Sequence, residues 1–213
     1  MIKHELTHHK PSYNLKSFKE YRDDIPYKEE HYDDDGLYHG PYREWYPNGI
    51  LKIEAHYKHN KNHGSHREWF DDGQLQYETF HKDDIRHGTA KQWYHNGNLR
   101  TVDSYENGKL HGKAYEYYEE GEILMEMEYK EEHLHGNFKQ YFQNGQIQIS
   151  MNYRNGLKCG VYKQFYDNGQ LHMWRTYKHD ELINAKVFTN PEYTINAIEK
   201  TTSTNDNTKT NAL

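Results

Sequence analysis

A glycine recurs every 24 residues along most of this chain, and this spacing limits the fold more than any other feature of the sequence. The first series runs from Gly40 to Gly160, and a second series with the same step runs from Gly49 to Gly169. A histidine precedes each glycine of the first series except the last, where Cys159 takes its place. Six copies in one register indicate a repeat array, in which each copy buries its apolar surface against its neighbours.

Each copy has the sequence pattern of a β-hairpin. In the first copy an Asn-Gly dipeptide at 48–49 separates an aromatic pair from an aliphatic residue, and Asn-Gly between apolar residues is a strong signal for a tight hairpin turn. A two-residue type I′ turn at this dipeptide places Tyr46 opposite Leu51 and Trp45 opposite Lys52. The sequence therefore predicts a specific register for every hairpin.

The expected fold is all-β. The six 24-residue hairpins should form an elongated array, stacked in one antiparallel sheet. At two strands per repeat and ~4.8 Å per strand, six hairpins span about 58 Å.

Departures from the repeat pattern mark the ends of the array and one copy inside it. We divide the chain into an N-terminal cap with a degenerate strand (1–35), the six-copy array with a closing half-repeat (36–188) and a disordered polar tail (189–213). In the second copy His81 occupies the column where other copies carry the strand-ending tyrosine, and Phe80 precedes it. This exchange predicts a one-residue bulge or slip.

Aromatic residues must replace the usual aliphatic core. Leu, Ile, Val and Phe together account for only 34 of 213 residues, a fraction typical of disordered chains, whereas the chain has 21 Tyr and 4 Trp. Alternation along each strand sorts the side chains onto two faces. The face expected to carry Tyr46, Leu51, Ile53 and Tyr57 is the predicted core.

The second face shows one ring per hairpin among Lys, Arg, Glu and Gln. Regularly spaced rings with polar neighbours suit recognition of a protein or peptide, and the alternative is that a capping element or a curled sheet covers them. The candidate partner-binding residues are Trp45, Trp69, Trp93, Tyr117, Tyr141 and Phe165. Because Trp is enriched among binding hot spots, the N-terminal half is the expected contact half.

The polar residues that suggest catalysis or metal binding also fit structural roles. Equivalent histidines of neighbouring hairpins lie about 9.5 Å apart, too far to share an ion whose ligands are about 3–4 Å apart. His63 and His66 could approach each other, but no other copy repeats the second histidine. Glu44 and Gln92 occupy the same repeat position, which favours a hydrogen bond over acid catalysis. We assign no catalytic residue, cofactor or metal ligand, and we expect the protein not to be an enzyme.

Charge and hydropathy narrow the set of partners. The formal net charge of −6 and the pI of about 6.3 give no sign of a nucleic-acid partner. The N-terminus has no continuous apolar stretch of the secretory type, and no window approaches 18 consecutive apolar residues. We therefore expect a cytoplasmic protein. Its oligomeric state stays open.

The pattern His-Gly-x-aromatic-x-Glu/Gln-aromatic-aromatic-x-Asn-Gly-x-Leu/Ile, at a period of 24 residues, resembles the MORN repeat (membrane occupation and recognition nexus) over about residues 36–188. It is most similar to the variant in bacterial proteins labelled as antitoxin components of the YwqK family. The resemblance implies a non-catalytic binding array: an antitoxin- or immunity-like module with a cognate toxin or effector as partner, or a scaffold. The alternative is a surface or membrane-associated structural protein, since some family members are tied to membranes or phospholipids.

The strict period predicts how the array tolerates deletions. Removal of residues 86–109, which is 24 residues, should preserve a cooperative unfolding transition at a melting temperature a few degrees lower, because the remaining copies rejoin in register. Removal of residues 86–97 should abolish that transition, because 12 residues leave one strand without its partner. Thermal unfolding followed by circular dichroism measures both deletions, and the opposite ranking would contradict the repeat assignment.

Overall fold

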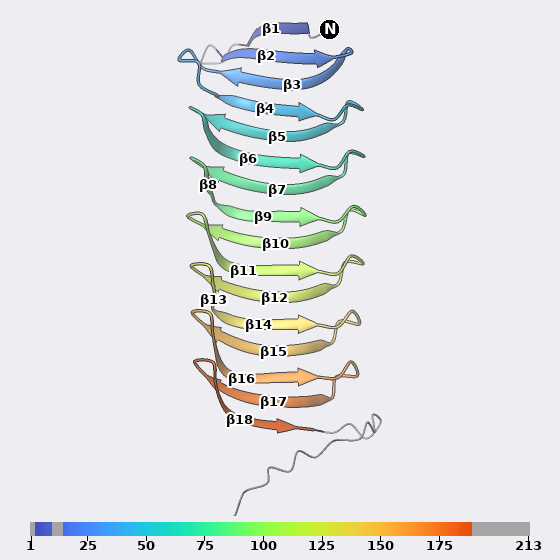
Figure 1. Ribbon diagram of the computed structural model, residues 1–213, viewed down its shortest axis with the longest axis vertical. Coiled ribbons are helices and arrows are strands. Elements are labelled where there is room, and N and C mark those ends of the chain that lie inside the picture. The colour runs from blue at the N-terminus through green and yellow to red at the C-terminus, as the bar shows by residue number, and fades with distance from the viewer. Residues whose placement is uncertain (1–2, 10–14, 189–213) are drawn as a thin grey trace, which may run out of the picture.

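The computed structural model describes residues 3–9 and 15–188, which form a single antiparallel sheet of 18 strands (Figure 1). Each long strand pairs with the long strands before and after it in the sequence, so the chain runs back and forth while it advances along the long axis. The described part of the chain contains no helix. The predicted all-β repeat array is therefore confirmed.

The strands fall into long members and two short segments. They are β1 (Lys3–His9), β2 (Leu15–Arg22), β3 (Ile25–Tyr32), β4 (Gly40–Trp45), β5 (Leu51–Lys58), β6 (Lys61–Trp69), β7 (Leu75–Lys82), β8 (Ile85–Arg86), β9 (Gly88–Trp93), β10 (Leu99–Glu106), β11 (Lys109–Tyr117), β12 (Ile123–Lys130), β13 (His133–Leu134), β14 (Gly136–Tyr141), β15 (Ile147–Arg154), β16 (Leu157–Phe165), β17 (Leu171–Lys178) and β18 (Glu181–Val187). The short strands β8 and β13 lead into β9 and β14 across one residue each, His87 and His135.

Additional strands stand at both ends of the six copies. A hairpin of β2 and β3 precedes the first copy and joins it where Lys28 faces Glu44 of β4. At the other end β18 pairs with β17, and its outer edge is the last edge of the described sheet. All seven residues of β18 are exposed, among them Leu182 and Val187. The predicted tail at 189–213 lies outside the described residues.

The Asn-Gly turn differs from the type I′ turn that the sequence predicts. Gly49 has a φ of 84°, but Asn48 is not among the residues with positive φ. The N–H of Gly49 donates to the carbonyl of Tyr46, and the N–H of Tyr46 donates to the carbonyl of Ile50. This is a three-residue loop with a type I turn and a glycine in the left-handed conformation. The predicted two-residue turn at this position is wrong.

Two-residue turns of the I′ kind lie instead at the opposite edge of the array. Both central residues of each turn have positive φ, as in His59 and Asn60 at 48° and 66°. Only two of the corresponding turns in later copies contain Asn-Gly, at 107–108 and 155–156, whereas another is Glu131-Glu132. Most copies therefore lack the Asn-Gly dipeptide that would predict this turn from the sequence.

The longer loop and a β-bulge change the predicted register next to it. Trp45 lies opposite Leu51, and the following pair is Glu44 with Ile53, so Lys52 is an extra residue in β5. The predicted pairs Tyr46–Leu51 and Trp45–Lys52 are wrong, because the loop is one residue longer than assumed and the bulge absorbs the difference. Beyond the bulge the predicted pairing of Glu44 with Ile53 is correct.

The His-Gly pair of each copy lies at a second irregularity. In β5 and β6, Ala55 faces His66 and Tyr57 faces Asn62, so β6 has two extra residues in this interval. Gly64 has a φ of 114° there, and a Cβ on it would lie 3.3 Å from the Cβ of His56. A side chain at Gly64 would be both strained and crowded, and the positive φ that all six glycines of this series share explains why glycine recurs.

The expected slip in the second copy does not occur. His81 lies opposite Gly64, as Tyr57 lies opposite Gly40 in the first copy, so the register is unchanged. Phe80 does not occupy the position of the strand-ending tyrosine, and it is 42% exposed. A histidine therefore replaces a tyrosine without any backbone change.

The turns of successive copies are joined by side chains. The Tyr46 hydroxyl donates to the carbonyl of Trp69 at 2.8 Å, and Tyr94 makes the equivalent bond to Tyr117 at 2.8 Å. The Asn48 amide donates to the carbonyl of Asp71 at 2.7 Å. Where Tyr and Asn recur at these positions, they link one copy to the next and do not only shape their own turn.

One carboxylate stands in the buried centre of the sheet. Asp103 lies opposite Ala90 on one side and Ala114 on the other, and both alanines are buried. Burial and the charge of Glu116 raise the pKa of Asp103 above its ordinary value of 3.8. Just above pH 3.8 the folded state therefore binds more protons than the unfolded state. At neutral pH the ionised Asp103 carboxylate lowers the free energy of unfolding by its full amount.

We expect Asp103→Asn to stabilise the array by up to about 1 kcal/mol at pH 7, because the variant removes a partly desolvated charge. The gain should shrink as the pH falls and disappear near pH 3.8, where wild-type Asp103 is also protonated in the unfolded chain. Urea unfolding at several pH values measures the difference. The exposed turn residue Asp167 provides the control as Asp167→Asn, and an equal gain in both variants would contradict the assignment.

Candidate functional site

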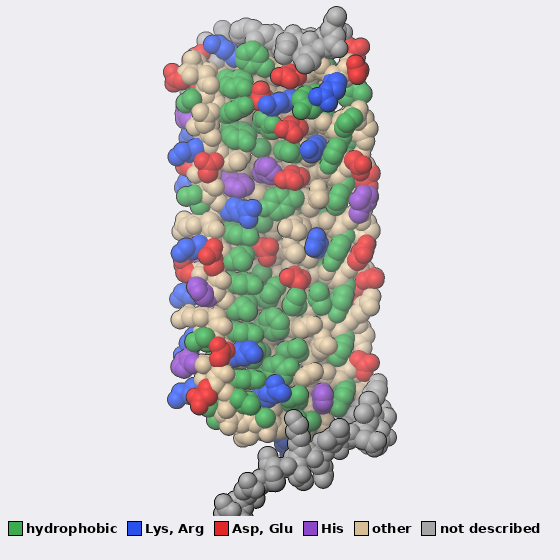
Figure 2. Space-filling view, in the orientation of Figure 1, with side chains coloured by type: hydrophobic (Ala, Val, Ile, Leu, Met, Phe, Trp, Pro, Cys, Tyr) green, Lys and Arg blue, Asp and Glu red, His purple; other side chains and the backbone are tan. Residues whose placement is uncertain are grey.

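One face of the sheet carries a row of side chains along its centre and a column of rings beside it. We call it the tyrosine face. The central row comprises Tyr42, Ala55, His66, Thr79, Ala90, Asp103, Ala114, Met127, Phe138, Met151 and Tyr162, and the column comprises Tyr57, His81, Tyr105, Tyr129, Tyr153 and Tyr177. Figure 2 shows hydrophobic side chains in bands along the long axis, with charged side chains along both margins.

At the N-terminal end the rings of this face contact one another. Tyr38 stacks against Tyr32 with centroids 4.8 Å apart and lies 5.5 Å from Tyr57. The hydroxyl of Tyr38 donates to Glu30 at 2.6 Å and that of Tyr32 donates at 3.0 Å. Burial opposes the charge of Glu30, but hydrogen bonds from Lys28, Tyr38 and Tyr32 outweigh it and hold the pKa of Glu30 below its usual value.

His81 creates a local exception in the tyrosine column. Its ring lies 6.1 Å from the ring of His66, and burial together with His66 lowers the pKa of His81 below its ordinary value of 6.5. His66 Nε2 also lies 2.9 Å from an Oε1 of Glu68. The second copy therefore places imidazoles where other copies present phenol rings.

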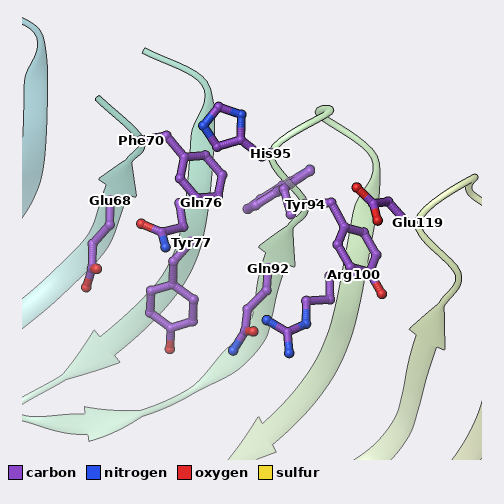
Figure 3. A pocket seen from close by; sticks show the side chains of 10 residues that line it. Glu68, Phe70, Gln76, Tyr77, Gln92, Tyr94, His95, Arg100 and Glu119 are labelled. Atoms are coloured by element: carbon purple, nitrogen blue, oxygen red, sulfur yellow. The ribbon is translucent and has the colours of Figure 1, made fainter. Parts of the chain in front are cut away.

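A hollow of about 520 Å³ opens on the tyrosine face between the second and third copies. Figure 3 shows its side chains, which come from β6, β7, β9, β10 and the adjoining turns. Its lining comprises Glu68, Phe70, Gln76, Tyr77, Gln92, Trp93, Tyr94, His95, Arg100 and Glu119. Gln76 and Tyr77 are consecutive yet both line it, because the bulge turns both side chains to one face.

The hollow occurs where one inter-copy link is missing. Phe70 stands at the position of Tyr46 and Tyr94 and has no hydroxyl to donate to the carbonyl of Trp93. The Phe70 ring packs against His95, with centroids 4.6 Å apart. Phe142 occupies the equivalent position of the fifth copy, so the second and fifth copies both lack this hydroxyl.

The chemistry of the hollow is polar and of mixed charge. Arg100 extends over the ring of Tyr94, with its guanidinium carbon 5.9 Å from the centroid, while Glu68 and Glu119 supply carboxylates at the margins. Amides of Gln76 and Gln92 add donors and acceptors. Small-molecule sites are enclosed and mostly apolar, so this open, polar hollow suits a side chain or loop of a partner better.

The six rings that the sequence singled out belong to the column on the opposite face, and one of them, Trp93, also contributes to the lining of the hollow. Lys19 extends over the ring of Trp45 at 5.3 Å, and Tyr141 contacts Lys139 and Glu126. All six rings are half-buried: Trp45, Trp69, Trp93, Tyr117, Tyr141 and Phe165. They form one column, as expected, but the structure does not bring them into one pocket.

The predicted surroundings of these rings are wrong in one respect. The bulge places Leu51, Leu75 and Leu99 opposite the tryptophans, in place of the expected Lys52, Gln76 and Arg100. The polar residues turn to the tyrosine face, where Lys52 lies over Tyr46 and Arg100 over Tyr94. The tryptophan column is therefore more apolar, and its polar margin smaller, than the sequence suggests.

Beside the ring column runs a row of alternating charges, the charged row. Its members face one another in the order Lys19, Glu29, Arg43, Glu54, Arg67, Glu78 and Lys91. Arg43 approaches Glu54 to 2.8 Å, and Arg67 approaches Glu78 to 2.7 Å. Opposite charges directly across strands stabilise this part of the sheet.

The repeated histidines pair with the two-residue turns. His63 Nδ1 lies 3.2 Å from Asp83 Oδ1, and His135 Nδ1 lies 3.1 Å from Asn155 Oδ1. His66, which the sequence placed near His63, instead belongs to the central row of the tyrosine face. The expected structural role of the histidine column fits these contacts.

Sequence reasoning missed the hollow, because its residues come from four strands and three turns. The column that contains Phe70 has tyrosine in four copies and phenylalanine at Phe70 and Phe142, so this exchange alone does not single out the hollow. The bulge that places Arg100 on the tyrosine face has no signature in the sequence, so the orientation of the Arg100 side chain could not be predicted. Within the described residues, no helix is long and apolar enough to cross a bilayer.

These features define a class of protein: an open, single-layer repeat array that presents aromatic and polar surfaces without a covering layer. The model of the MORN repeat variant family matches six segments of the chain, at 38–59, 62–83, 86–107, 110–131, 134–155 and 158–179. The chain therefore belongs to the MORN repeat variant family. None of the curated proteins matches it.

The exchange at Phe70 gives a paired prediction. Phe70→Tyr should stabilise the array by about 0.5–1.5 kcal/mol, because its hydroxyl gains the carbonyl of Trp93 as acceptor. Tyr94→Phe should destabilise by a similar amount through loss of its bond to Tyr117. Chemical unfolding of both variants measures the two effects, and destabilisation by Phe70→Tyr would show that the link was not simply missing.

Proposed function

We propose that this array is a non-catalytic protein-binding module and that the tyrosine face around the hollow contacts the partner. The observation that carries the proposal is the exposure of this face. No strand or helix of the described chain packs over it, because all described strands belong to one sheet (Figure 1), and the ring-lined hollow is open. A surface of this kind is available for a second molecule.

The chemistry of the face supports a protein partner. Tyrosine offers a large rigid ring with a polar tip, which is why it dominates protein recognition surfaces. Arg100 and the amides beside it supply hydrogen bonds of fixed direction. Tyr77 and Tyr94 flank them, so apolar and polar contacts alternate over a short distance.

The specific form we propose is an antitoxin- or immunity-like role against a cognate toxin or effector in the cytoplasm, with a scaffold role as the broader form. Family resemblance to YwqK-type antitoxins supports the specific form, and the net charge of −6 suits a partner of opposite charge. A surface or membrane-associated structural role is the alternative. The charged row, in which both signs alternate, gives little support for attraction to anionic lipid.

The two faces can be separated by substitution. Arg100→Ala and Tyr77→Ala on the tyrosine face should each weaken partner binding by about 2 kcal/mol, as expected for central interface residues. Lys91→Ala in the charged row is the matched control and should bind normally. Affinity purification followed by titration of the recovered partner measures the effect, and flotation with anionic vesicles tests the alternative.

The tryptophan column is tested in the same series. Trp69→Ala should lower the free energy of unfolding by about 2–4 kcal/mol, because the ring packs opposite Leu75. A folded Trp69→Ala protein that loses the partner while Arg100→Ala and Tyr77→Ala retain it would move the contact to the opposite face. Loss of partner binding in Lys91→Ala alone would also place the contact on the opposite face.

A further inference from the structure

Two histidines and an aspartate from three separate segments meet at one edge of the array. Asp33 follows β3, His39 precedes the first repeat glycine, and His59 opens the two-residue turn between β5 and β6. Asp33 Oδ2 lies 2.8 Å from His59 Nδ1 and 3.7 Å from His39 Nδ1. The three ligand atoms all lie within 4.8 Å of one another.

The carboxylate is held in position before any ligand binds. Asp33 Oδ1 accepts hydrogen bonds from the N–H groups of Leu37 at 2.9 Å and Asp35 at 3.1 Å. The Asp33 side chain is only 10% exposed. Its second oxygen, Oδ2, therefore faces the histidines with little freedom to turn away.

The two imidazoles differ in mobility. The side chain of His39 is 18% exposed, whereas that of His59 is 53% exposed. Their rings approach edge to face with centroids 4.9 Å apart. His59 can thus adjust from the solvent side while Asp33 and His39 form the fixed part of the group.

The distances suit a tetrahedral divalent ion. Two ligands at about 2.0–2.1 Å from Zn²⁺ are about 3.3 Å apart, and the distances from Asp33 Oδ2 to the two histidine nitrogens, 2.8 and 3.7 Å, lie on either side of that value. Two imidazoles and one carboxylate form a donor set that Zn²⁺ and neighbouring transition metals prefer over Mg²⁺ or Ca²⁺.

We propose that Asp33, His39 and His59 bind a divalent transition metal, with Zn²⁺ as the best-fitting ion, and that this ion fastens the segment after β3 to the turn after β5. Three protein ligands leave coordination positions for water. The proposal is independent of partner binding on the tyrosine face.

Only the first copy combines these ligands. In the second copy the corresponding positions hold His63 and Asp83, whose Nδ1 and Oδ1 atoms are 3.2 Å apart. Among the residues that the structure describes, the group of Asp33, His39 and His59 is the one in which three such atoms meet this closely. The pair of the second copy is therefore a control within the same chain.

The repeat itself supplies substitutions that preserve the turn. Positions equivalent to His59 hold Asn107 and Asn155, both with positive φ, so His59→Asn keeps a residue that this backbone accepts. Asp33→Asn retains Oδ1 as acceptor for the two N–H groups and removes the charged ligand. Asp83→Asn makes the same kind of change in the second copy and serves as control.

The test is Zn²⁺ titration of the untagged chain in competition with a chromophoric chelator, together with Co²⁺ absorption spectra and thermal unfolding with and without Zn²⁺. We expect one tight site, Co²⁺ bands of tetrahedral type and a higher melting temperature with Zn²⁺. His59→Asn and Asp33→Asn should each weaken Zn²⁺ binding by about 100-fold or more, while Asp83→Asn leaves it unchanged.

The chain has 17 histidines, so binding alone does not identify the site. Undiminished affinity in both His59→Asn and Asp33→Asn would overturn the proposal, as would the absence of Zn²⁺ binding in the wild-type chain. If a variant lost its cooperative unfolding transition without metal, the other variant would decide, because the two changes lie in different segments.

Discussion

The continuous ladder of backbone hydrogen bonds between neighbouring strands is the interaction on which the rest of this structure depends. A single-layer sheet cannot bury a large core, and the buried apolar residues of the described part of the chain are Ala55, Ala90, Ala114 and Met151. Order along the array must therefore come from strand pairing and from bonds between successive turns, such as Tyr46 to Trp69. Each copy stabilises only its neighbours, and the 24-residue period keeps every such contact in register.

In this architecture the same aromatic rings pack against one another and form the exposed surface. Tyr38 and Tyr57 pack against each other on a face that no other layer covers, and their polar tips make this exposure tolerable. The opposite face combines half-buried tryptophans with a row of alternating charges, of which the Arg43–Glu54 contact is typical. The sheet can therefore remain open on both sides, which is the property that the proposed binding role requires.

Differences among the copies give the array its local features. Phe70 replaces a linking tyrosine and lines the hollow, while His81 replaces a column tyrosine and brings imidazoles together. His59 stands at a turn position that is Asp, Asn or Glu in the next four copies and His179 in the last, and it approaches Asp33. In each case the backbone is that of every other copy, and one side chain changes the chemistry. The repeat sets the position, and the departure from the repeat sets the local chemistry.

The sequence by itself determined the fold class, the number of copies and the column of six rings, because a strict period in glycine and aromatic residues has few physical solutions. It also determined the pairing of Glu44 with Ile53. Only the tertiary structure decided the loop type at Gly49, the bulge at Lys52 and hence the face on which Arg100 lies. An Asn-Gly dipeptide is compatible with two turn lengths, and only pairing across strands selects between them. Contacts such as Asp33 with His59 join residues from different segments, so spacing within one copy could not reveal them.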